Sequence, residues 1–287
     1  MKKLFFAMAC VIGLMTFASC DPEIMSEIME QKPEIQLVEA EGYIWHNIGV
    51  RLGTELDFQV TVAPNTGSMS ELTDVSFTVK NGNNTVLKSE SAEIEDPAGE
   101  NTIGFSFEPE EASTYTCTIT VTDAANKSNE VIVIVVCSEP VEAVNGIYGG
   151  TLNMTGYVTT NEIAGYEGYD HEEVSVTDVP ITLTLGEIDE EGNVQVGVDV
   201  EDSYLALTGT MENNTVSING IYFYSAIKLF VNVYAEFNVN IVGNINEGVM
   251  TLSGTAEAAG EAQVLTAKLE VTFEDGTLEG TLEEIVE

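Results

Sequence analysis

The amino-acid sequence predicts an all-β protein of two domains, a β-sandwich followed by an up-and-down β-barrel of eight or nine strands. Three observations support this fold class. The 287 residues correspond to two domains at about 150 residues each. From Glu34 onward, apolar and polar residues alternate with a period of two, which is typical of half-buried strands. Short Gly- and Asn-containing links separate the alternating segments and favour hairpins.

Composition excludes several classes of protein. A hydrophobic fraction of 44% is too high for a disordered chain, even at a formal net charge of −39. The chain has 9 Lys and Arg against 48 Asp and Glu, and phosphate binding requires clustered basic residues. Nucleic acid is therefore excluded as a partner, and docking on anionic lipid is disfavoured.

The first domain is expected over residues 34–138, with seven or eight strands. Leu56, Phe58, Val60 and Val62 alternate with polar residues, and residues 114–122 read T-Y-T-C-T-I-T-V-T. Such strands indicate an antiparallel sandwich with one buried face per sheet. Trp45, the only Trp, is expected in the first strands of this domain.

Cys117 and Cys137 have two interpretations. If the last two strands form a hairpin whose register places these residues opposite each other, they form a disulfide, which export would permit. Bridges between adjacent strands are uncommon, and buried thiols pack well as small hydrophobic groups. Two free, buried thiols are therefore the favoured interpretation.

A linker is expected at residues 139–144 and the barrel at 145–287. Nine segments alternate with a period of two, and links such as Asp275-Gly276 are expected to join neighbours as hairpins. A sequence of hairpins removes its exposed edges by closing into a barrel. Leu-x-Gly-Thr recurs at 207–210, 252–255 and 278–281, where glycine lets a barrel strand bend. The uninterrupted alternation over 227–241 is too long for a straight strand, so this segment is expected to bend or to split in two.

The N-terminus is predicted to be a signal peptide, residues 1–19. Two lysines precede an apolar stretch over 4–18 that is too short to span a membrane. Phe17-Ala18-Ser19-Cys20 then resembles the lipobox of bacterial lipoproteins. This resemblance implies export, cleavage before Cys20, and an outer-membrane anchor of acyl chains on Cys20, with residues 20–33 as a tether. The alternative is plain cleavage that leaves Cys20 a free thiol. Asp21, directly after Cys20, resembles the inner-membrane retention signal of some Gram-negative bacteria. Acidic residues at this place, Asp21 and Glu23, also resemble the surface-export signal of other lipoproteins, so both the membrane and the leaflet stay open.

Two further resemblances concern the folded domains. Tyr115, two residues before Cys117, is similar to the tyrosine corner of immunoglobulin folds, so the first domain resembles the Ig-like or PKD-like modules of bacterial surface proteins. The glycine-containing segments 145–152 and 276–282 resemble the ends of the calycin-like (lipocalin-like) barrel of bacterial lipoproteins. That family is mostly of unassigned function, so the resemblance implies a fold and a location.

Catalytic motifs are scarce. His46 and His171 are the only histidines, one in each domain, and both are interpreted as solvated or turn residues. The sequence has no Gly-x-Ser-x-Gly, phosphate loop, Cys-x-x-Cys or His-Glu-x-x-His motif. Acidic runs at 170–173 and 189–191 lack the spacing of a calcium loop. We therefore expect no cofactor, no metal and no enzymatic activity, with a carboxylate-based glycoside hydrolase as an alternative.

Tyrosines of the second domain are the candidate ligand-binding residues. These are Tyr157, Tyr166 and Tyr169, beside a long loop, and Tyr222 and Tyr224, at the end of a strand. Aromatic rings at the mouth of a hollow barrel suit sugars or small apolar ligands. The alternative is that they plug a filled barrel, with Leu183, Val196, Leu207, Leu252 and Leu269 inside.

The leading functional hypothesis is a non-enzymatic binding or accessory lipoprotein in which the first domain holds the barrel away from the membrane. Its partners would be the bilayer, through Cys20, and a glycan, a small apolar ligand or another surface protein. A second hypothesis is a fimbrial or adhesin subunit processed at Arg51, the only arginine.

Overall fold

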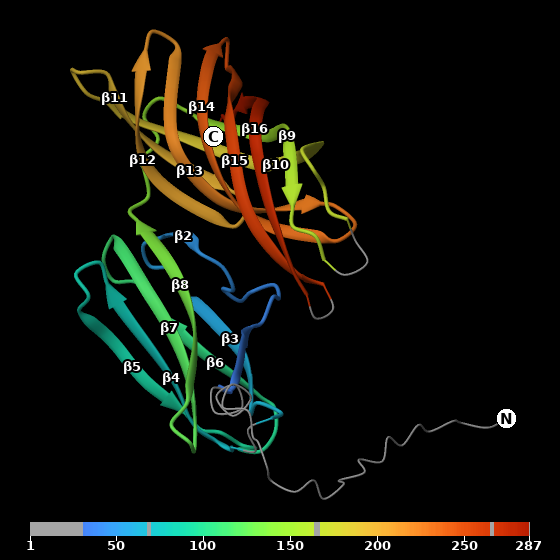
Figure 1. The fold of residues 1–287 in the computed structure, drawn as a ribbon. Helices are drawn as coiled ribbons and strands as arrows, with labels where there is room; N and C mark the ends of the chain where they lie inside the picture. Colours follow the sequence, from blue (N-terminus) through green and yellow to red (C-terminus); the bar gives the residue numbers. More distant parts are fainter. Residues whose placement is uncertain (1–30, 68–69, 164–166, 265–266, 287) are drawn as a thin grey trace, which may run out of the picture.

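The computed structural model describes residues 31–67, 70–163, 167–264 and 267–286. In these residues the chain is all-β and forms two domains, a pair of packed sheets and a closed barrel (Figure 1). Cys20 lies outside the described residues. Within them, we find no helix with the length and apolar character that a bilayer span requires.

The first domain consists of two sheets that share one apolar core. One sheet has the order β1-β3-β6 and the other β2-β8-β7-β4-β5. All neighbours are antiparallel except β2 and β8, which are parallel. Phe77 packs between Phe58 and Phe105, at ring-centroid distances of 5.3 and 5.2 Å. The strands are β1 (Glu34–Leu37), β2 (Ile48–Arg51), β3 (Leu56–Ala63), β4 (Leu72–Asn81), β5 (Val86–Ala92), β6 (Asn101–Phe107), β7 (Ser113–Asp123) and β8 (Ser128–Ser138).

The second domain is an eight-stranded barrel. Each strand pairs with its neighbours in sequence, and β9 pairs with both β10 and β16 to close the ring. The strands are β9 (Ile147–Thr160), β10 (Glu172–Ile188), β11 (Asn193–Val200), β12 (Ser203–Glu212), β13 (Thr215–Lys228), β14 (Asn232–Asn246), β15 (Val249–Val264) and β16 (Ala267–Glu284).

Asp275-Gly276 is not the hairpin link that the sequence analysis expected. Segments 262–274 and 276–284 largely belong to the single strand β16, and the pairing with β9 changes register between Glu274 and Thr277. Asp275 has a positive φ of 50° at this point. A bulge of this kind bends a strand without ending it, and an 18-residue strand must bend to follow the barrel wall.

The long segment over 227–241 was expected either to bend or to split in two, and the structure shows that it splits. β13 ends at Lys228 and β14 begins at Asn232. The expected inward face is confirmed for β14, where Val233, Phe237 and Val239 are fully buried.

The barrel interior is filled. Leu183, Val196 and Leu269 expose 0% of their surface and Leu252 exposes 1%, while Leu207 is partly buried against the same cluster. A side chain beside a void large enough for water would expose surface to that void, so no such void borders Leu183, Val196, Leu252 or Leu269. Phe237 completes the packing between Phe223 and Phe273, at 5.4 and 5.6 Å between ring centroids. An internal ligand at this level of the barrel is therefore excluded.

The two domains dock through β2 and β12. Three consecutive residues are buried in each strand, Ile48–Val50 in one and Ser203–Leu205 in the other. Successive side chains of a strand point to opposite faces, so both faces of each strand are covered. A Cβ on Gly49 would lie 2.3 Å from the carbonyl oxygen of Tyr204 and 2.6 Å from Cδ2 of Leu205. Only glycine permits this approach.

Polar contacts centred on Tyr204 fix the linker to the barrel. The Tyr204 hydroxyl accepts a hydrogen bond from the Val141 amide at 2.8 Å and donates one to the Glu139 carbonyl at 3.3 Å. The guanidinium of Arg51 lies 4.2 Å from the centre of the Tyr204 ring and pairs with Asp199. Residues 139–144 are therefore an ordered connection held against β10 and β12.

We predict that Gly49→Ala separates the domains. The added methyl group would meet backbone, which cannot move aside, so we expect a loss of about 1–3 kcal/mol in docking free energy. Small-angle scattering should show a larger radius of gyration. Gly104→Ala is the matched control, because a Cβ there has only an ordinary contact of 3.8 Å within the first domain. Equal dimensions for the two variants would contradict the prediction.

Candidate functional site

An open cleft lies between the domains, around four rings. One hollow of 420 Å³ and another of 1220 Å³ share Trp45, His46, Tyr224 and Tyr234 in their walls. Trp45 and His46 precede β2 in the first domain, whereas Tyr224 lies on β13 and Tyr234 on β14 of the barrel. We refer to the two hollows together as the aromatic cleft. Neither domain alone forms it.

His46 is the buried centre of the cleft wall. It exposes 8% of its surface, and its Nδ1 lies 2.8 Å from the Asn47 carbonyl oxygen. Its Nε2 lies 3.1 Å from Oδ2 of Asp202, in the turn between β11 and β12. A carbonyl and a carboxylate oxygen can only accept hydrogen bonds, so both ring nitrogens donate. This arrangement therefore favours the imidazolium form of His46.

Electrostatics agree with that assignment. Burial lowers the pKa of His46, but the hydrogen bonds to Asp202 and Asn47 and the negative charges of Asp202 and Glu236 outweigh it, so the pKa is raised above 6.5. The Tyr224 ring stacks on His46 at a centroid distance of 4.4 Å and an interplanar angle of 17°. A cation over an aromatic face is attracted by the ring quadrupole. His46 thus joins the two domains through charge, hydrogen bonding and stacking.

Trp45 and Tyr234 form the more open part of the ring cluster. Their centroids are 4.9 Å apart at an angle of 81°, and Trp45 meets His46 edge-on at 4.5 Å. Tyr234 is 41% exposed. These contacts fix the two rings, while part of their surface faces the cleft.

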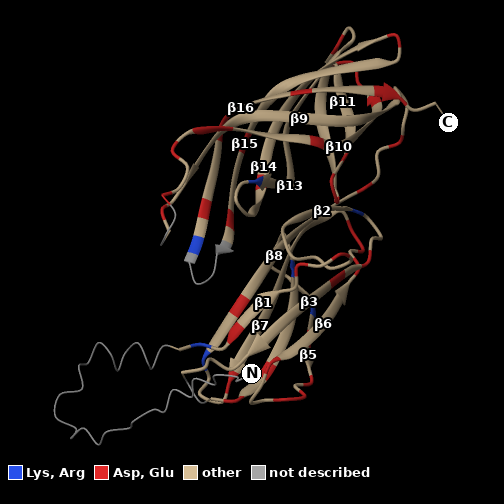
Figure 2. Ribbon diagram, turned by 90° about the vertical axis from the view of Figure 1, so that its right-hand side faces the viewer, with Lys and Arg blue, Asp and Glu red and all other residues tan. Residues whose placement is uncertain are grey.

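Polar groups surround the rings. Ser225 donates a hydrogen bond to Glu201 at 3.0 Å, and both residues line the smaller hollow. Lys228 lines the same hollow, and no ion pair joins it to any residue that the structure describes. In the larger hollow, Lys268 pairs with Glu261 and with Glu270. Figure 2 shows acidic segments over both domains and few basic ones.

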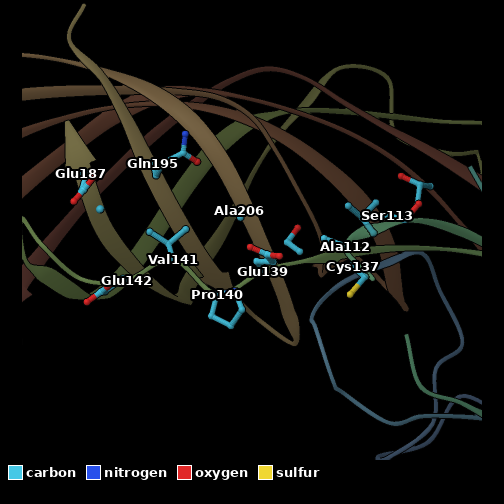
Figure 3. Close-up of a pocket in the computed structure, with 14 residues that line it drawn as sticks. Ala112, Ser113, Cys137, Glu139, Pro140, Val141, Glu142, Glu187, Gln195 and Ala206 are labelled. Atoms are coloured by element: carbon cyan, nitrogen blue, oxygen red, sulfur yellow. The ribbon is translucent and has the colours of Figure 1, made fainter. Parts of the chain in front are cut away.

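A different hollow, of 610 Å³, borders the linker (Figure 3). Glu142 and Glu187 lie at one end of it, and Ser113 and Cys137 at the other. Its remaining walls mix small apolar residues with the polar side chains of Ser138, Glu139 and Gln195, and no aromatic ring lines it. This linker pocket therefore lacks the aromatic rings that the aromatic cleft offers to a ligand.

The predicted tyrosines do not form one site. Tyr224 lies in the aromatic cleft, and Tyr222, two residues away on the same face of β13, borders an adjoining hollow of 340 Å³. Tyr157 stacks on His171 at 4.2 Å. Tyr169 packs against the barrel core, and Tyr166 lies outside the described residues. Because Phe223 points inward, Tyr222 and Tyr224 face the first domain and do not lie at a barrel mouth.

The structure does not form the disulfide between Cys117 and Cys137. Cys117 is opposite Val133, and Cys137 is opposite Ser113. Both thiols are free and buried, and burial raises the pKa of Cys117 to about 12 and raises that of Cys137. Thiols that remain protonated are unreactive, so both residues serve packing.

The interpretation of His46 as a solvated or turn residue is wrong, whereas His171 is an exposed turn residue with a positive φ of 56°. His46 pairs with Asp202 across 156 positions of sequence, a contact that local patterning does not reveal. Trp45 and Tyr234 were missed for the same reason. The adjacent Trp45-His46 beside an apolar run was the only local signal.

We predict that the His46 contribution to stability depends on pH. Because the folded pKa is raised, this contribution is complete below about 6.5 and is lost as the pH rises through the folded value. Asp202→Asn should remove about 1 kcal/mol, a small value because Asp202 is half exposed. Since the chain has two histidines, proton NMR resolves the His46 titration. A midpoint at or below 6.5, or one that Asp202→Asn leaves unchanged, would refute this assignment.

Comparisons with known proteins were made for the whole chain. No protein-family model and no curated protein matches it. A solved structure of a protein of unknown function from the DUF3598 family, from Nostoc punctiforme, is similar over 75% of this chain and 96% of its own, at 10% sequence identity and a TM-score of 0.23. A TM-score of 0.23 is too low for this likeness to indicate a shared function.

Proposed function

We propose that this protein is an exported, outer-membrane lipoprotein that acts as a non-enzymatic binding or accessory module and takes its ligand in the aromatic cleft. The observation that carries the binding role is the convergence of Trp45 and His46 with Tyr224 and Tyr234 from the other domain. Partly exposed rings beside a few polar groups are typical of ligand sites at domain interfaces.

The anchor rests on the lipobox-like residues that end at Cys20 and on the position of the tether. Asn129 donates a hydrogen bond to the Pro33 carbonyl at 3.1 Å, so the chain enters beside the start of β8. β8 then runs 11 residues to Ser138, next to the linker. At 3.2–3.4 Å per residue this strand spans about 35 Å. This path from the entry of the chain to the linker supports the proposed role of the first domain as a spacer.

The proposal also assigns an Ig-like fold to the first domain and a calycin-like fold to the second. An Ig-like first domain is supported by Tyr115, whose hydroxyl donates to the Glu111 carbonyl at 2.7 Å, the bond expected of a tyrosine corner. A calycin-like second domain is supported by eight strands in sequential order. In this proposal the first domain is more than a spacer, because it supplies part of the cleft wall.

A non-enzymatic role is supported by the way in which the cleft acids are used. Asp202 accepts a hydrogen bond from His46, and Glu201 accepts one from Ser225. A glycoside hydrolase needs one carboxyl group to deliver a proton and another to attack or activate water. No specific observation favours the hydrolase or the fimbrial alternative, and Arg51 is engaged with Asp199 and Tyr204 at the domain junction.

We predict that Cys20→Ala abolishes membrane attachment. Without the thiol no acyl chain is added, so the protein should move from the membrane fraction to the soluble fraction and lose labelling by palmitate. Cys10→Ala is the matched control, because Cys10 lies within the apolar part of the signal and should leave both readouts unchanged. Continued labelling of the Cys20→Ala variant would refute the lipid anchor.

We also predict that a cleft ligand stabilises both domains together, since both contribute to its walls. At a ligand concentration of 100 times Kd the gain is about 2.7 kcal/mol, which a thermal-shift screen of glycans, lipids and peptides detects. Ligands found in this way should lose their effect on Gly49→Ala and keep it on Gly104→Ala. Equal shifts in the two variants would place the ligand elsewhere, and no shift with any class would contradict a binding role.

A further inference from the structure

The size and walls of the aromatic cleft indicate an extended ligand. The larger hollow, of 1220 Å³, exceeds the range of about 300–1,000 Å³ that is usual for compact small-molecule pockets. It reaches from residues 36–39 and Ile132 of the first domain to β15 and β16 of the barrel. The smaller hollow extends it past the same rings. An extended chain molecule can contact more of the walls of such a long cleft than a compact molecule can.

The lining pairs aromatic rings with hydroxyl and amide groups. Beside Trp45 and Tyr234 lie Ser175, Thr177 and Asn232. A wholly apolar ligand, such as an acyl chain, would cover these polar groups without hydrogen bonds, which is costly. A sugar ring presents C–H groups on its face and hydroxyl groups at its edge. The C–H face suits an aromatic ring, and the hydroxyl groups suit side chains that both donate and accept.

The charge of the protein further restricts the class of ligand that suits the cleft. The chain carries a formal net charge of −39, which opposes the approach of an anionic polymer. Three carboxylates of the cleft already have cationic partners, Asp202 in His46 and Glu261 and Glu270 in Lys268, whereas Glu39 and Glu201 line the cleft without an ion pair among the described residues. A basic peptide would have to compete with these cations. A neutral ligand is not repelled by the negative charge of the chain and does not compete with these cations.

We propose that the aromatic cleft binds a neutral oligosaccharide chain, with sugar rings stacked on Trp45 and Tyr234 and with hydroxyl groups bound by the polar side chains beside them. This inference rests on the proposed binding function and names its ligand class. Since both hollows adjoin the ring cluster, sugar units extend to both sides of it. Longer oligomers of one sugar series should therefore bind more tightly than short ones.

The test uses Trp45 as the probe, because it is the only Trp of the chain and lies in the cleft. The purified whole chain is titrated with oligomers of neutral glucans, mannans, xylans and galactans, and also with anionic glycans, basic peptides and fatty acids. Tryptophan fluorescence is the first readout, and calorimetry of the same mixtures is the second. We expect a saturable change with at least one neutral series, with affinity that rises with oligomer length.

Tyr234→Ala should weaken this binding about tenfold, which corresponds to about 1.4 kcal/mol. Tyr157→Ala is the matched control, since Tyr157 is 36% exposed, stacks on His171 and lies outside the cleft. Binding of peptides, acyl chains or anionic glycans alone would overturn the oligosaccharide inference and leave the binding function in place. No binding of any class in either readout would overturn both. Equal losses in the two variants would overturn the stacking on Tyr234.

Discussion

The close contact of β2 with β12 is the constraint on which the rest of the molecule depends. Gly49 lies against the Tyr204 carbonyl, where a side chain would collide, and this approach covers both strands on both faces. The ion pair between Arg51 and Asp199 is a weaker contribution, because the two side chains are 47% and 33% exposed and exposed pairs contribute at most about 1 kcal/mol. Packing therefore sets the docking, and the polar contacts select its orientation.

The filled barrel explains why the candidate site lies outside it. Small eight-stranded barrels have an interior that side chains can fill, and here Phe237 with its aromatic neighbours and the leucines of several strands fill it. The outer wall of β13 and β14 then carries the barrel side of the candidate site. Tyr224 and Tyr234 stand on that wall beside inward-facing Phe223 and Val233, so one pair of strands serves both the core and the cleft.

Much of the fold can be predicted from the sequence, because the alternation of apolar and polar residues indicates which face of a strand is buried. Strands β3, β4, β6 and β7 of the first domain, the sequential barrel and the inward set of β14 all follow from it. Alternation does not record what covers a face, so Tyr222 and Tyr224 were assigned to a barrel mouth. The cleft brings His46 to Asp202 across 156 positions, and only the docking of two complete domains creates such a contact. The bulge at Asp275 was mistaken for a turn because both use a residue with positive φ.

The contacts of Tyr204 also bear on how such a chain can evolve. In many surface proteins, domains joined by loose connections are exchanged by recombination, and each one keeps its properties in a new setting. Here the Tyr204 ring and hydroxyl contact Arg51, Glu139 and Val141 at once. Glycine is required at position 49 only because the backbone of β12 lies so close to it. A domain brought in by recombination would not make these contacts with the remaining domain. Exchange of one domain alone would lose these contacts, and changes at positions 51 and 204, whose side chains are in contact, are expected to occur together.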